Sequence, residues 1–239
     1  MTTPTAAFVG ATGGAGTTRL CLEAAALLAS EGDDVLVLVL DAAYATQGLA
    51  GHVEGRIDTD VTRLVTEQRP LAAGCYEIAT AGSGTAECVP ARAPFERVAH
   101  AKTPEAAQRL ASLVASARER ADAVLLDVPP VAANQSVAAV DAGDRIVVVA
   151  PGTRRGADGT ARTRDRLTDI GTEVDAVVAT RTEDADFADV AVPTDDTPTG
   201  DTPIADAGNG AFTAGVASVV ETVFDVTIER SFDDGLLPL

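Results

Sequence analysis

The sequence predicts an α/β fold, with a doubly wound, mostly parallel sheet flanked by helices. Short apolar runs rich in Val, Ile and Leu alternate along the chain with longer stretches that carry apolar residues at helical spacing. Aromatic residues make up only 3% of the chain and Trp is absent, so the core is aliphatic, which suits strands buried beneath helices. A chain of 239 residues is long enough to form one large domain and requires no second one.

The elements follow from these runs in chain order. Buried parallel strands are expected where four to seven apolar residues occur together, at 6–10, 35–40, 123–127, 145–150 and 174–180. Helices are expected where apolar residues recur every three or four positions, at 18–30, 104–120, 157–170 and 211–224. Two stretches rich in Gly, Pro, Ser, Thr or Asp, 82–94 and 184–210, are predicted to be surface loops. We expect one domain over 1–225 and an acidic C-terminal tail over 226–239.

The charge of the chain limits its partners. The formal net charge is −18, and only one of the 18 basic residues, Lys102, is a lysine. An acidic surface almost without lysine is typical of proteins from halophilic archaea, because concentrated salt screens the repulsion between carboxylates. The alternative is an ordinary acidic protein. In both cases the charge disfavours binding to nucleic acid and to anionic lipid.

No targeting or membrane signal is apparent. The N-terminus lacks a basic region followed by an apolar one, and no run of about 18 apolar residues occurs, so we expect a cytoplasmic protein. Residues 225–239 carry four acidic groups and one arginine and cannot form a basic amphipathic anchor. The three cysteines show no CxxC spacing, and His52 and His100 have no companions at metal-ligand spacing, so both histidines are expected at the surface.

A glycine-rich segment follows the first predicted strand directly. Residues 10–19 read GATGGAGTTR and lead at once into a predicted helix. Glycines allow successive backbone N–H groups to turn inward around an anion, and the N-terminus of the helix adds positive potential. The hydroxyl of Thr18 can serve as a ligand of Mg²⁺. The alternative is a glycine-rich turn without a ligand.

This segment resembles the phosphate loop of the ParA/MinD/CobQ family of P-loop proteins (SIMIBI class), which reads K-G-G-x-G-K-[ST], and the similarity extends over nearly the whole chain. The resemblance implies a P-loop NTPase fold and a nucleotide phosphate site at Gly13, Gly14, Ala15, Gly16, Thr17 and Thr18. Two departures stand out, because Thr12 and Thr17 occupy the positions of the two lysines. Loss of lysine lowers turnover by orders of magnitude, and it implies that binding of ATP and Mg²⁺ is weak or absent. Arg19 is rotated by ~200° from Thr17 on the helix and is a poor replacement.

Two aspartates extend the resemblance. The run 123–130, AVLLDVPP, resembles the family's Walker B strand, which implies that Asp127 and Thr18 share one Mg²⁺. Counting from Thr18 without gaps places Asp41 at the second aspartate of the D-x-D segment, which positions the attacking water in relatives, so Asp41 is the candidate catalytic residue. Alternatively, Asp41 caps the turn after its strand, and a shift of two residues makes Ala43 the second position.

The C-terminal half matches the family more loosely. Arg181 and Pro193 correspond to the residues around the base, although Thr180 replaces the asparagine that recognises it. Between Thr153 and Arg166 there are five arginines and two aspartates, which indicates a solvated helix face or a protein contact rather than a DNA surface.

Three functions remain open. The first is a regulatory or scaffolding pseudo-ATPase that acts through a protein partner or as a homodimer, with weak or no hydrolysis. The second is an active ParA/MinD-type ATPase for chromosome partition, division-site placement or cell polarity. The third is an ATP-dependent ligase of the CobQ or dethiobiotin synthetase kind, which also needs a phosphate-loop lysine.

Overall fold

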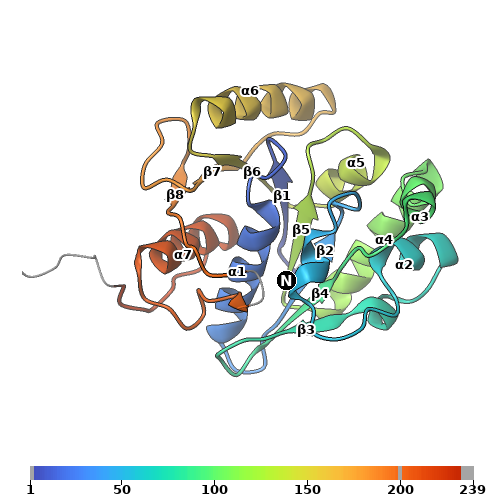
Figure 1. Cartoon of the computed structure of the whole chain (residues 1–239), viewed down its shortest axis with the longest axis horizontal. Coiled ribbons are helices and arrows are strands. Elements are labelled where there is room, and N and C mark those ends of the chain that lie inside the picture. Colours follow the sequence, from blue (N-terminus) through green and yellow to red (C-terminus); the bar gives the residue numbers. More distant parts are fainter. Residues whose placement is uncertain (1–2, 199–200, 233–239) are drawn as a thin grey trace, which may run out of the picture.

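The computed structural model describes residues 3–198 and 201–232. Within these residues the chain forms an eight-stranded sheet with helices on both faces (Figure 1). The strands are β1 (Thr5–Gly10), β2 (Leu36–Asp41), β3 (Tyr76–Ile78), β4 (Thr85–Val89), β5 (Ala123–Val128), β6 (Arg145–Pro151), β7 (Ala176–Thr180) and β8 (Val190–Val192). Their order across the sheet is β3-β4-β2-β5-β1-β6-β7-β8, and only β3 runs antiparallel to its neighbour. The predicted fold class is confirmed.

Helices separate the strands along the chain. They are α1 (Thr17–Ser30), α2 (Val61–Glu67), α3 (Phe95–His100), α4 (Pro104–Arg120), α5 (Asn134–Asp141), α6 (Arg154–Asp169) and α7 (Ala211–Phe224), with short 3₁₀ turns η1 (Gly48–His52) and η2 (Leu71–Gly74). In the part of the chain that is described, no helix is both long and apolar enough to cross a membrane.

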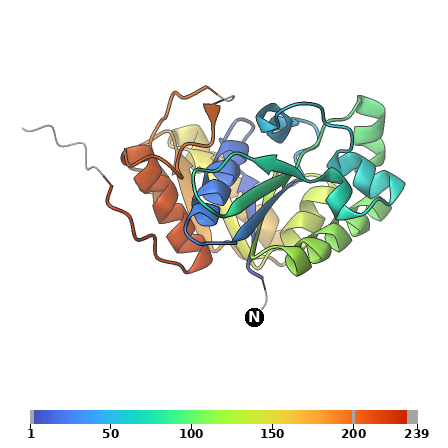
Figure 2. The same ribbon diagram turned by 90° about the horizontal axis from the view of Figure 1, so that it is seen from below.

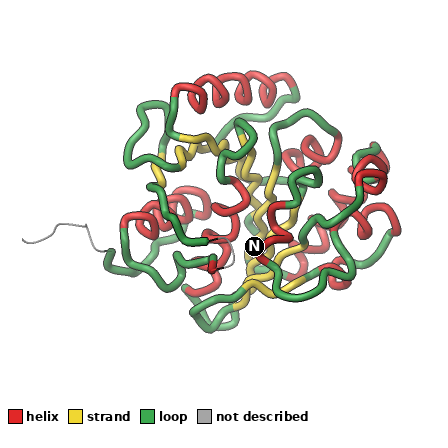
Figure 3. Tube along the Cα trace, viewed as in Figure 1, coloured by secondary structure: helices red, strands yellow, loops and turns green. Residues whose placement is uncertain are grey.

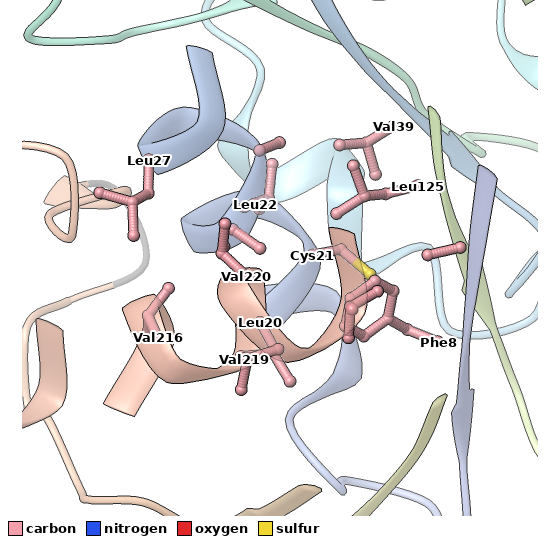
Figure 4. Packing of buried hydrophobic residues seen from close by; sticks show 14 of the residues in the cluster. Phe8, Leu20, Cys21, Leu22, Leu27, Val39, Leu125, Val216, Val219 and Val220 are labelled. Carbon is pink, nitrogen blue, oxygen red and sulfur yellow. The ribbon is translucent and has the colours of Figure 1, made fainter. Parts of the chain in front are cut away.

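The helices lie on both faces of the sheet (Figure 2), and an aliphatic core lies between the sheet and the helices on each face. On one face, α1 packs against the central strands, and α7 packs against α1 and against β7 and β8 near one edge of the sheet. Leu20 and Leu22 of α1 lie beside Val219 and Val220 of α7, and Cys21 of α1 points toward Phe8 of β1 (Figure 4). The other core lies beneath α2, α3, α4, α5 and α6. Parallel strands buried on both faces place their carboxyl ends at one edge, which is where ligands bind in such sheets.

The segment 82–94 departs from its prediction as a surface loop. Residues 85–89 form β4, an internal strand that pairs in parallel with β2 and antiparallel with β3. A Cβ on Gly84 would lie 2.1 Å from the carbonyl oxygen of Ala29, so this glycine permits close contact with α1 rather than a surface turn. The second predicted loop is largely irregular but contains β8 (Figure 3).

The expected tail begins as part of the folded body. Ile228 is buried in the core under α1, and Arg230 pairs with Glu31 at 2.7 Å and donates to Ser30 Oγ. The remainder of the predicted tail, 233–239, lies outside the described residues.

Candidate functional site

The glycine-rich segment forms a tight loop between β1 and α1. Gly14 and Gly16 have φ values of 73° and 90°, a region that favours glycine, and Gly16 is the residue before the first turn of α1. The open N–H groups of that first turn therefore face the loop, at the carboxyl edge of the sheet.

A cavity of ≈370 Å³ lies above this loop. The six residues predicted to bind phosphate all line it, namely Gly13, Gly14, Ala15, Gly16, Thr17 and Thr18. Its other walls come from the ends of β1 and β5, from the segment after β2 and from Arg181 after β7. This arrangement can bind an anion through backbone N–H groups.

Thr18 and Asp127 meet at the floor of the cavity. The Thr18 hydroxyl donates a hydrogen bond of 2.6 Å to Asp127 Oδ2, and both residues line the cavity. Burial raises the pKa of the Asp127 carboxyl to about 6, although the bond from Thr18 opposes the shift. A hydroxyl and a carboxylate are hard oxygen ligands that suit Mg²⁺ when a phosphate supplies further oxygens, so these two residues fit the ion. No cluster of three or more Asp, Glu, His or Cys with metal-binding geometry occurs among the described residues.

Asp41 is placed differently from the catalytic role predicted for it. Its Oδ1 accepts a hydrogen bond of 2.7 Å from the Ala43 N–H, and its Oδ2 accepts one of 3.0 Å from the Ala91 N–H. The side chain is fully buried and does not line the phosphate cavity, whereas Ala43 does. Burial and the neighbouring charge of Asp127 raise the pKa of Asp41 well above its usual value. The geometry thus favours the alternative, in which Asp41 holds the turns after β2 and β4.

The two threonines at the lysine positions are held within the fold. Thr17 is 8% exposed, and its Oγ1 lies 3.0 Å from where a Cβ on Gly10 would be, so its side chain points beneath the loop. Thr12 lies against α6, where a Cβ on Gly159 would come within 2.8 Å of Thr12 Cγ2. Neither side chain brings a positive charge to the cavity.

A second, smaller cavity of ≈180 Å³ adjoins the first and shares Gly16, Arg19 and Arg181 with it. Arg181 and Pro193, the two residues predicted to surround the base, both line it, together with Leu20, Val192 and Phe212. The Thr180 hydroxyl, at the position of the expected asparagine, donates to the Ala15 carbonyl at 2.7 Å. It therefore fixes the phosphate loop to β7 and is not free to recognise a base through that proton.

Arg19 lines the phosphate cavity, but its guanidinium is paired with two carboxylates. Its Nε donates 3.0 Å to Glu23 Oε1 and its Nη2 donates 2.8 Å to Asp195 Oδ1. The guanidinium also lies over the Phe212 ring, 5.1 Å from the ring centroid. These contacts agree with the rotation expected from its helical position.

Sequence reasoning missed some residues of the phosphate cavity. His52 lines it, although it was expected at the surface as an isolated residue, and burial together with the charge of Arg19 lowers the pKa of its imidazole. Its Nδ1 lies 2.9 Å from Thr202 Oγ1. The segment 42–52, which follows β2, places His52 at the cavity. The one signal for this in the sequence was Asp41, whose side chain holds the turn at the start of that segment.

No protein-family model and no curated protein sequence matches the chain. Among solved structures, the cell division ATPase MinD of Pyrococcus furiosus is similar, with a TM-score of 0.73 and 16% identity over 93% of this chain and 99% of that chain. The septum site-determining protein MinD of Pyrococcus horikoshii OT3, complexed with Mg-ADP, has a TM-score of 0.73 and 17% identity over 92% and 95% of the two chains.

A third structure is the MinC:MinD cell division protein complex of Aquifex aeolicus, with a TM-score of 0.71 and 17% identity over 96% of this chain and 100% of that chain. At these identities the likeness concerns the fold, and it extends over nearly the full length of each protein. The protein has the ParA/MinD-like P-loop fold.

Proposed function

We propose that this protein is a regulatory or scaffolding module that binds Mg²⁺-nucleotide at the phosphate loop, hydrolyses it slowly or not at all, and acts through protein contacts. The observation that carries the proposal is the composition of the phosphate cavity. It keeps the glycine loop, Thr18 and Asp127, yet Thr12, Thr17 and Ala43 stand where relatives with the resemblance described above have two lysines and an aspartate.

The retained residues support binding. The positive φ angles of Gly14 and Gly16 present backbone N–H groups to an anion without any lysine. Thr18 and Asp127 are the residues that would hold Mg²⁺, which when bound neutralises charge on the phosphate oxygens. Mg-ADP is present in the Pyrococcus horikoshii structure, which supports this class of ligand for a chain of the same fold.

The lost residues argue against turnover. Phosphoryl transfer depends on positioning and on charges that stabilise the transition state, and removal of one such group costs roughly 10²–10³ in rate. Among the described residues that line the cavity, Asp127 is the only carboxylate, and it already accepts the Thr18 hydroxyl. An attacking water therefore has no second carboxylate to orient it.

The exposed face of α6 is the surface we assign to a protein partner. This helix carries five arginines and three aspartates in a chain of net charge −18. Arg155, Arg162 and Arg166 fall within ~40° of one another on the helix and face solvent. The Aquifex structure is a complex between MinD and a protein partner, which supports protein contacts for this fold, and an acidic partner surface would complement the arginines.

Calorimetric titration with ATP and GTP, with and without Mg²⁺, tests the binding claim. We expect a nucleotide to bind wild-type protein in the presence of Mg²⁺. Affinity should fall by about 10- to 100-fold in Asp127→Asn, because metal-site residues typically contribute that much. Asp141→Asn, on the exposed end of α5, is the matched control and should bind as wild type does. Absence of heat from folded wild-type protein with either nucleotide would overturn the proposal.

A further inference from the structure

Arg181 occupies an unusual position directly after β7. Its φ is 60°, in the left-handed region that few non-glycine residues adopt, and its side chain is turned back over the phosphate loop. The Arg181 Nη2 donates a hydrogen bond of 2.8 Å to the Gly14 carbonyl oxygen. The same nitrogen lies 3.8 Å from where a Cβ on Gly16 would be, so the guanidinium rests against the loop between these glycines.

The charge of Arg181 is free of acidic partners. In the described part of the chain, no carboxylate lies within 4.0 Å of its guanidinium, and the residue is exposed. Arg19, the other arginine at this cavity, is paired with Glu23 and Asp195. A guanidinium has five N–H donors, and the bond to Gly14 uses one of them. The remaining donors are available to an anion in the cavity.

We propose that Arg181 is the phosphate-binding cation of this site and supplies, from the end of β7, the charge that lysines at positions 12 and 17 would have supplied from the loop. The inference rests on the proposed function and names the residue that recognises the diphosphate part of a nucleoside di- or triphosphate. A planar guanidinium matches a pair of phosphate oxygens, which a threonine hydroxyl cannot do.

This assignment changes the role predicted for Arg181, which was recognition of the base. The residue lines both cavities and therefore lies where they join. The smaller cavity offers apolar walls from Leu20, Val192 and Phe212, which suit a ring, whereas the larger one offers the loop N–H groups and Asp127. The bond to the Gly14 carbonyl holds the guanidinium on the side of the loop, where the phosphates would lie.

Three probes separate the two roles: inorganic pyrophosphate, ATP and adenosine, each with Mg²⁺ and at constant ionic strength. The test variant is Arg181→Asn, because asparagine tolerates the left-handed conformation. Arg181→Lys keeps the charge and loses the planar fork. Arg56→Asn is the matched control, since Arg56 has an 88% exposed side chain in a loop and does not line either cavity. Circular dichroism and thermal melts establish that each variant is folded.

We expect Arg181→Asn to weaken the binding of pyrophosphate and of ATP by about 10- to 100-fold, which is the range for hydrogen bonds to charged groups. The binding of adenosine should stay unchanged. Arg181→Lys should lose less affinity for pyrophosphate and ATP than Arg181→Asn does, and Arg56→Asn should bind both as wild type does. If wild type binds ATP and Arg181→Asn binds it equally well, the inference is overturned while the proposed function stands. Selective loss of adenosine would overturn it in favour of a base-binding role. Failure of wild type to bind any phosphate probe would overturn the proposed function together with the inference.

Discussion

Asp41 and Asp127 are direct neighbours in the sheet and yet have different environments. They are paired in register on β2 and β5, and both are almost completely buried. Both carboxylate oxygens of Asp41 accept hydrogen bonds from backbone N–H groups, those of Ala43 and Ala91. Asp127 instead accepts a hydrogen bond from Thr18 and lines the cavity. The sequence places an aspartate at the end of each strand but does not specify which one faces the loop. That depends on the path of the turns after β2 and β4.

The buried Asp127 carboxyl should make the stability of the protein depend on pH. Its folded pKa of about 6 lies above the ordinary 3.8, so its stabilising contribution is complete below about pH 4 and is lost as the pH rises through about 6. The total is on the order of 3 kcal/mol, of which about 1.4 kcal/mol falls between pH 5 and pH 7.5. We predict that the free energy of unfolding of wild type falls by that amount relative to Asp127→Asn over this interval, in urea titrations without Mg²⁺. A constant difference between the two proteins would contradict the raised pKa.

At the scale of elements, the long segment between β8 and α7 is fastened to α1 by one buried carboxylate. Glu23 is 0% exposed, and its Oε2 accepts hydrogen bonds of 2.8 Å from the N–H groups of both Ile204 and Ala205. Its Oε1 accepts from Arg19, which also donates to Asp195 of the same segment. This contact fixes the wall of the smaller cavity from beneath.

Glu23→Ala should therefore be strongly destabilising. The change leaves two buried backbone N–H groups without their acceptor and removes one of the two carboxylates paired with Arg19, at a cost of about 3 kcal/mol or more. Glu67→Ala removes an exposed carboxylate of α2 and should change stability by no more than about 0.5 kcal/mol. Chemical denaturation measures both, and limited proteolysis should show faster cleavage near residue 204 in Glu23→Ala alone. Equal stability of the two variants would show that the hydrogen bonds of Glu23 to Ile204 and Ala205 do not stabilise the fold.

The strands and helices that have clear periodicity could be predicted from the sequence, and those whose role depends on contacts could not. The helix at 104–120 and the helix at 211–224 have the predicted bounds, and the five predicted strands are present with shifts of one or two residues. The strand β4 was missed because Gly84 reads as a turn residue, whereas its contact with Ala29 becomes visible only when α1 is placed. The phosphate loop was recognisable because its glycines are adjacent in sequence. Arg181 lies 167 residues from Gly14, and local sequence does not reveal that they meet.

At the scale of the whole molecule, the main feature is the large negative net charge. A net charge of −18 on a chain with one lysine places mutual repulsion over most of the surface. Some of the described arginines form ion pairs with exposed carboxylates, as Arg56 does with Asp58. Exposed pairs of this kind contribute little to stability.

We predict that salt stabilises the protein, because it screens the repulsion among the acidic groups of the surface. Screening of the repulsion in molar potassium chloride should raise the melting temperature by about 10 °C relative to dilute buffer, which corresponds to a few kcal/mol for a chain of this size. Sodium chloride at equal ionic strength should produce a similar rise if screening is the cause. A melting temperature that stays constant or falls with salt would contradict the prediction.

The most direct test of the central claim is the release of inorganic phosphate by purified protein under Mg-ATP concentrations at which binding is saturated. Because Thr12 and Thr17 bring no positive charge to the cavity and Asp127 is the only carboxylate among the described residues that line it, the rate should not exceed the background of a Thr18→Ala variant, which lacks the hydroxyl bonded to Asp127. Bound nucleotide without turnover is the predicted result. Turnover in the wild type that disappears in Thr18→Ala would contradict the account and establish an active ATPase.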